Sequence, residues 1–135
     1  MNNSKQNLNI LLVDDDLDFL DSIKTMLEST GYNVVTAESV SEAESKLNEN
    51  NLDLAIVDLM LEKVDGGFTL CYKIKKQNPQ IPVIMVTGVA SETNLSFDAE
   101  TDEERSWIKA DAVLDKPVRF EELEREIARL TQPQK

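Results

Sequence analysis

Short apolar runs alternate with amphipathic segments along almost the whole chain, and this alternation constrains the fold more than any other feature of the sequence. The apolar runs predict strands at 8–13, 33–37, 54–57, 83–86 and 112–114. Between these runs, apolar residues recur at helical spacing and predict helices at 17–30, 41–50, 68–77 and 120–130. Strands that alternate with helices form a parallel sheet covered on both faces. We therefore predict a doubly wound α/β domain with five parallel strands.

Local signals mark several ends of the predicted helices. Asp16 is a candidate N-cap for the first helix, and Gly31 follows its last turn. Ser41 and Glu44 have the spacing of a capping box at the start of the second helix. The run Asp65-Gly66-Gly67 is interpreted as a turn before the third helix.

No linker rich in glycine, serine or proline divides the chain, so a single domain is predicted for residues 8–130. Residues 1–7 are polar and are expected to form a disordered N-terminal tail, and residues 131–135 are expected to form a C-terminal tail. The alternation is weakest at 89–109. Here we expect a loop as far as about residue 100 and then a short helix at 101–109, which carries Trp107.

The sequence contains no histidine and a single cysteine, Cys71. This excludes Ser–His and Cys–His catalysis, a role as the phosphohistidine donor, an intrachain disulfide and a cysteine-based zinc cage. The net charge of −12 disfavours direct contact with nucleic acid or anionic membrane. No apolar run approaches the ~20 residues of a membrane span, and residues 1–7 lack the apolar stretch of a secretory signal. We therefore expect a cytoplasmic protein without membrane insertion.

Chemically active side chains follow four of the five predicted strands. Asp14-Asp15-Asp16 follows the first strand, Asp58 the third, Thr87 the fourth and Lys116 the fifth. In a doubly wound sheet, ligands bind beyond the carboxyl ends of the strands. We therefore expect carboxylates, a hydroxyl and an ammonium group to converge on one edge of the sheet.

This set of groups suits the transfer of a phosphoryl group. Carboxylates a few ångströms apart repel one another, and a hard divalent cation such as Mg²⁺ relieves that repulsion. Asp58 can then act as a nucleophile toward phosphorus and form an acyl phosphate. The Lys116 ammonium and the Thr87 hydroxyl are suited to bind the incoming oxygens.

Each of these residues has a simpler explanation when it is taken alone. Asp14 and Asp15 could be solvated loop acids, Thr87 is of a type common at strand ends, and lysines such as Lys116 are common on surfaces. Asp58 is harder to explain in this way because the third strand should be central. The combination, with members at the ends of different strands, favours a built site.

At this point the chain resembles the receiver domain of two-component response regulators. The matching motifs are ILLVDDD at 10–16, AIVDLML at 55–61, the pair Asp65-Gly66, PVIMVTG at 82–88 and LDKP at 114–117. The resemblance covers about residues 8–130. It implies a flavodoxin-like receiver fold with the strand order 2-1-3-4-5.

The resemblance also implies roles for the acidic residues. Asp58 would be the phosphorylated aspartate. Asp15 would bind Mg²⁺ directly, Asp14 would bind it through water, and Asp58 and the backbone carbonyl of Met60 would complete the protein ligands. The phosphoryl donor would be a sensor histidine kinase or a phosphotransfer protein. The domain would be no conventional enzyme, since it would promote only its own phosphorylation and dephosphorylation.

On the switching side, the resemblance implies that Thr87 closes on the phosphoryl group and that Lys116 pairs with it. The Lys116–Pro117 peptide bond is expected to be cis, as is usual in the family. The switching surface would comprise 101–109, 112–114 and 120–130, and would act on a downstream protein.

The chain departs from the family pattern at several positions. Val113 stands where an aromatic switch residue is usual, Leu61-Glu62 replaces the usual Met-Pro, and Gly67 is an apparent insertion. The segment from Thr87 to Lys116 is also longer than usual by about two helical turns, roughly seven residues. We expect output to run through residues 89–109 in an altered way.

Two alternatives to a stand-alone receiver stay open. The first is a receiver taken from a larger multidomain regulator or kinase, or one used only as a binding module. The second is a haloacid-dehalogenase-like phosphatase, because Asp14 and Asp16 have an Asp-x-Asp spacing. That family places paired acids on a strand after the lysine, whereas here a predicted helix with Glu121 and Glu122 follows Lys116.

Overall fold

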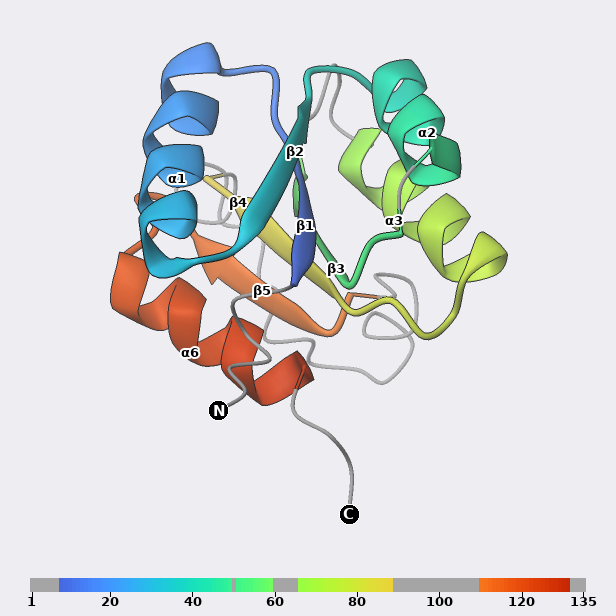
Figure 1. Ribbon diagram of the computed structural model, residues 1–135. Coiled ribbons are helices and arrows are strands. Elements are labelled where there is room, and N and C mark those ends of the chain that lie inside the picture. Colours follow the sequence, from blue (N-terminus) through green and yellow to red (C-terminus); the bar gives the residue numbers. More distant parts are fainter. Residues whose placement is uncertain (1–7, 50, 60–65, 89–109, 132–135) are drawn as a thin grey trace, which may run out of the picture.

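Five parallel strands form one sheet in the order β2-β1-β3-β4-β5 (Figure 1). The computed structural model describes residues 8–49, 51–59, 66–88 and 110–131. The strands are β1 (Asn9–Val13), β2 (Asn33–Ala37), β3 (Leu54–Asp58), β4 (Val83–Thr87) and β5 (Ala112–Asp115). The predicted doubly wound α/β fold and its strand order are confirmed.

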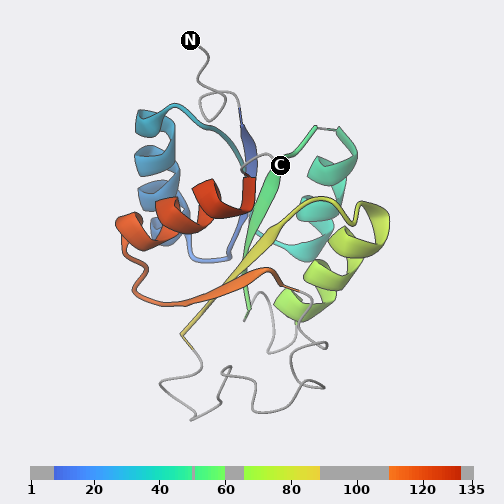
Figure 2. The ribbon, with the colours of Figure 1, turned by 90° about the horizontal axis from the view of Figure 1, so that it is seen from below.

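Four helices of the described residues cover the two faces of this sheet. They are α1 (Leu17–Thr30), α2 (Val40–Glu49), α3 (Gly66–Gln77) and α6 (Phe120–Thr131). Figures 1 and 2 show α1 and α6 on one face and α2 and α3 on the other. Each pair packs on its own hydrophobic cluster, so the sheet separates two layers of core.

The strand residues alternate between these two cores. Along β1, Ile10 and Leu12 pack on the side of α1 and α6, whereas Leu11 and Val13 pack on the side of α2 and α3. Every residue of β3 is buried, because it lies between β1 and β4 with helices on both faces. Burial on both faces explains why these strands appear in the sequence as continuous apolar runs.

Helix α1 begins and ends at strong local signals. Its N-cap is Asp16, whose Oδ1 accepts hydrogen bonds from the backbone N–H groups of Asp18 and Phe19. Gly31 follows the helix with φ of 111°, and its N–H donates to the carbonyl of Glu28. The capping roles predicted for Asp16 and Gly31 are thereby confirmed.

We expect Gly31→Ala to destabilise the protein by about 1–2 kcal/mol, because a Cβ is disfavoured at this left-handed backbone conformation. Urea unfolding followed by circular dichroism would measure the change. Glu28→Ala, at an exposed position in the last turn of α1, is the control and should change stability by less than about 0.5 kcal/mol. Equal stability of Gly31→Ala and wild type would contradict the prediction.

The start of α2 differs from the prediction. The helix begins at Val40, and its capping residue is Ser39, whose Oγ accepts a hydrogen bond from the N–H of Glu42 at 3.1 Å. The predicted capping box at Ser41 and Glu44 is therefore wrong by two residues. Ser39 and Glu42 have the same spacing, and this choice leaves Val40 packed against the core.

The start of α3 also differs from the prediction. Gly66 and Gly67 form the beginning of this helix, so the predicted turn at these two glycines is wrong. Asp65, the Leu61-Glu62 pair, the tail 1–7, the predicted helix 101–109 with its preceding loop, and residues 132–135 lie outside the described residues. Within the described part of the chain, no helix combines the length and apolar character that crossing a membrane requires.

Candidate metal and phosphoryl-acceptor site

Backbone hydrogen bonds hold the site residues to the carboxyl edge of the sheet. Each bond joins a residue at or just past a strand end to the neighbouring strand, so the ladder of the sheet continues into the site. The bonds are Asp14 N–H to Ala37 O at 3.1 Å, Leu59 N–H to Val86 O at 2.8 Å, and Lys116 N–H to Thr87 O at 2.9 Å. The sheet itself therefore fixes where these residues lie.

Three carboxylates from two strands meet at this edge. Asp14, Asp15 and Asp58 each offer an oxygen, and these oxygens lie within 4.8 Å of one another. Asp14 is 1% exposed and Asp58 5% exposed, whereas Asp15 is open to solvent. Acidic clusters are common on protein surfaces, but two of these three carboxylates are buried, where charge is costly unless it is compensated.

Lys116 supplies positive charge to this cluster. Its Nζ donates a hydrogen bond to Asp14 Oδ2 at 2.9 Å and lies 3.7 Å from Asp58 Oδ1. Burial by itself lowers the pKa of Lys116, but the hydrogen bond to Asp14 and the negative charges of Asp14 and Asp58 outweigh it, so the pKa is raised. Lys116 therefore stays protonated at neutral pH.

The negative charge of Asp14 is costly because the side chain is buried. Burial raises its pKa above the usual value of an aspartate and is the largest effect. Hydrogen bonds from the N–H of Asp16 and from Lys116 lower the pKa, as does the charge of Lys116, and the charge of Asp15 raises it. Because the net shift is upward, the pairing with Lys116 compensates only part of the burial.

The donor set fits a hard divalent cation. Among the described residues, three carboxylates lie near one ammonium group, so negative charge is left over. Mg²⁺ prefers oxygen ligands of this kind. The residues that would hold it are Asp14, Asp15 and Asp58. The fourth predicted ligand, the backbone carbonyl of Met60, lies outside the described residues.

The remaining predicted residues lie on the adjacent strands. Thr87 is the last residue of β4, is fully buried, and is the register partner of Asp115 on β5. The Lys116–Pro117 peptide bond is cis, which confirms the geometric prediction. Val113 is half-buried on β5 and packs against the core on the side of α2 and α3.

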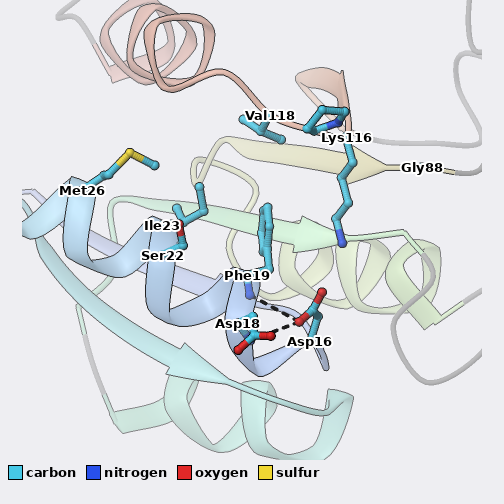
Figure 3. A pocket seen from close by; sticks show the side chains of 10 residues that line it. Asp16, Asp18, Phe19, Ser22, Ile23, Met26, Gly88, Lys116 and Val118 are labelled. Atoms are coloured by element: carbon cyan, nitrogen blue, oxygen red, sulfur yellow. Dashed lines mark hydrogen bonds between the residues drawn. The ribbon is translucent and has the colours of Figure 1, made fainter.

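A groove of about 650 Å³ adjoins the carboxylates, and it contains residues that the sequence interpretation missed (Figure 3). Phe19, Ile23 and Met26 of α1 form one wall, and Lys116 and Val118 form part of the other. Ile23 belongs to the buried stripe of α1, whereas Phe19 and Met26 are half-buried beside that stripe and were not predicted as site residues. Their helical spacing from Ile23 was the available signal, because it continues the apolar face of α1 toward the groove.

The chain is a doubly wound α/β domain. At the carboxyl edge of its sheet, carboxylates and the Lys116 ammonium group lie close together. A family model, described as the response regulator receiver domain, matches residues 10–128. The chain belongs to this family.

Individual similar proteins support membership in the receiver family. Among curated proteins, the transcriptional regulatory protein CpxR of Escherichia coli (strain K12) is 37% identical over 114 residues, which are 84% of this chain and 45% of CpxR. A solved CheY-like receiver domain protein from Methanospirillum hungatei JF-1 is 34% identical with a TM-score of 0.76, covering 90% of this chain and 91% of that chain. The response regulator protein TrrA from Thermotoga maritima, solved in complex with Mg²⁺-BeF, is 27% identical with a TM-score of 0.73, covering 91% and 98%.

The chain spans only part of the curated relatives that it matches, between 18% and 46% of their length. Some of these longer relatives, such as CpxR, are named as transcriptional regulatory proteins. The comparison therefore assigns this chain to the receiver domain and leaves the activities of the longer proteins to be tested.

Proposed function

We propose that this receiver domain accepts a phosphoryl group on Asp58 in a Mg²⁺-dependent reaction. The observation that carries the proposal is the position of the Asp58 carboxylate. It is buried at the end of the central strand β3, beside the oxygens of Asp14 and Asp15 and 3.7 Å from the Lys116 ammonium. A nucleophile, a set of hard oxygen ligands and a cation thus share one pocket.

Each residue of the pocket has its own role in the proposed phosphoryl transfer. An oxygen of Asp58 attacks phosphorus, the bond from phosphorus to the donor's leaving atom breaks, and the leaving group departs with the electrons of that bond. Asp14, Asp15 and Asp58 would hold Mg²⁺, which when bound would neutralise negative charge during the transfer. Lys116 would neutralise charge as a second cation, and Thr87, the last residue of the neighbouring strand β4, would donate its hydroxyl to a phosphoryl oxygen.

The partners follow from this chemistry and from the family. The donor is a phosphohistidine on a sensor histidine kinase or a phosphotransfer protein, and the output is a change at β5, α6 and residues 89–109 that a downstream protein reads. The related protein TrrA was solved in complex with Mg²⁺-BeF, which supports the metal dependence. The chain's own acidity, with a net charge of −12, supports protein rather than nucleic-acid contacts.

The phosphatase alternative has less support. It needs paired acids on a strand after the lysine, but the described stretch from Lys116 to Thr131 contains one helix, α6, and no strand. Whether the receiver acts alone or within a longer regulator is decided by the native gene.

The direct test is incubation with acetyl phosphate, followed by intact mass spectrometry. With Mg²⁺ we expect the mass of one added phosphoryl group, and hydroxylamine should remove it, because it cleaves acyl phosphates. With EDTA in place of Mg²⁺, the adduct should fall at least about tenfold, because the carboxylates then repel the anionic donor. If neither acetyl phosphate nor a phosphorylated histidine phosphotransfer protein yields an adduct in Mg²⁺, the proposal is wrong.

A further inference from the structure

Lys116 has a third neighbour besides the two carboxylates. Its Nζ lies 4.5 Å from the centroid of the Phe19 ring, within the range of a cation–π interaction. Phe19 rises from the first turn of α1 and Lys116 comes from the loop after β5, and Figure 3 shows both side chains extending into the same groove. Both are half-buried, so the ring and the ammonium group interact where solvent screens them less than on an open surface.

These contacts close a ring of four residues. Lys116 donates to Asp14 Oδ2, and Asp14 Oδ1 accepts from the N–H of Asp16 at 2.9 Å. Asp16 Oδ1 accepts in turn from the N–H of Phe19 at 3.3 Å, and the Phe19 ring faces the ammonium group of Lys116. The helix cap that begins α1 therefore also fixes the backbone from which the Phe19 ring extends toward the lysine.

The aromatic ring of Phe19 helps to hold the flexible Lys116 side chain in one position. A lysine side chain has several rotatable bonds, and the ammonium group must lie where oxygen charge develops during transfer. Asp14 alone would draw Nζ away from Asp58, since Nζ lies 2.9 Å from the Asp14 oxygen and 3.7 Å from the Asp58 oxygen. The face of an aromatic ring attracts the cation from another direction without adding a competing negative charge.

We propose that Phe19 is a positioning residue, whose ring holds the Lys116 ammonium in place for transfer to Asp58. This inference rests on the proposed function, and it adds a role for a residue outside the acid, threonine and lysine set. Phe19 acts through Lys116, whose ammonium group lies over its ring.

The test compares two substitutions at one position. Phe19→Leu keeps an apolar side chain but removes the ring, whereas Phe19→Tyr keeps the ring. With acetyl phosphate and Mg²⁺, we expect Phe19→Leu to gain its phosphoryl group about three- to tenfold more slowly than wild type, and Phe19→Tyr to react within about twofold of it. Met26→Leu changes another wall residue of the same groove and is the matched control with an unchanged rate.

A double-mutant cycle tests the contact without any phosphoryl transfer. Urea unfolding of Phe19→Leu, Lys116→Met and the double variant should show a coupling of about two- to fivefold in the unfolding equilibrium constant. Zero coupling overturns the inference, as does a Phe19→Leu that reacts as fast as wild type, or a Phe19→Tyr that is as slow as Phe19→Leu. A wild-type chain that gains no phosphoryl group overturns the proposed function itself, which separates the two failures.

Discussion

Asp58→Asn should fold normally and gain no phosphoryl group under conditions in which the wild type is fully modified. An amide is isosteric with the carboxylate, so the buried position at the end of β3 can accept it, but it cannot attack phosphorus. We expect the adduct on Asp58→Asn to fall by at least about a thousandfold, to background, by intact mass spectrometry.

Removing one charge from the crowded pocket should also leave the variant at least as stable as the wild type. Asp21→Asn is the matched control, because Asp21 is an exposed carboxylate on α1 outside the cluster, and its adduct should equal that of the wild type. A full adduct on Asp58→Asn would show that another residue accepts the phosphoryl group and would contradict the assignment.

Asp14→Asn should stabilise the protein at neutral pH while weakening its response to Mg²⁺. The Asp14 carboxylate is buried, and its raised pKa shows that its neighbours do not fully compensate its charge. We expect a gain on the order of 1–3 kcal/mol in the free energy of unfolding in EDTA at pH 7, the usual scale for an imperfectly compensated buried polar group. Urea unfolding measures this directly.

The sign of the pH dependence follows from the direction of the pKa shift. Since the folded state holds the Asp14 proton more tightly than the unfolded chain, the wild type loses stability as pH rises from 3.8 through the raised pKa. The advantage of Asp14→Asn should therefore shrink as the pH is lowered from 7 toward 4. An advantage that grew on acidification would contradict this account.

Magnesium should narrow the stability difference between Asp14→Asn and the wild type. A cation that binds only the folded state stabilises it by about 2.7 kcal/mol at a hundred times its Kd. The wild type and Asp21→Asn should gain this amount, and Asp14→Asn should gain clearly less. Equal gains in all three proteins would exclude Asp14 from the metal site.

The sequence predicted those parts of the fold that depend on short-range signals. Both ends of α1 match the prediction, because Asp16 and Gly31 are residues whose local chemistry determines a helix boundary. The buried strands were visible because two-sided burial leaves no polar alternation. The set of site residues was predicted for a similar reason, since the strand ends of such a sheet meet at one edge.

The errors arose where packing chose between equivalent local signals. Ser39 and Ser41 both precede a glutamate at capping-box spacing, and the burial of Ala43 and the packing of Val40 select the first. Gly66 begins α3 although glycine has a low helix propensity. It lies in the first turn, where the backbone N–H groups have no partner within the helix. The preference of Lys116 for Asp14 over Asp58 likewise depends on side-chain packing that no spacing reveals.

The hydrogen bond from Lys116 to Asp14 joins residues 102 positions apart in the chain. A polypeptide still emerging from the ribosome therefore carries its acidic residues long before it has the cation that pairs with them. Products that end before β5 have Asp14 and Asp58 but lack the lysine that compensates their charge. Under the proposed function, we expect such truncated molecules to accept a phosphoryl group poorly, because the carboxylates of the pocket are then left without their cation.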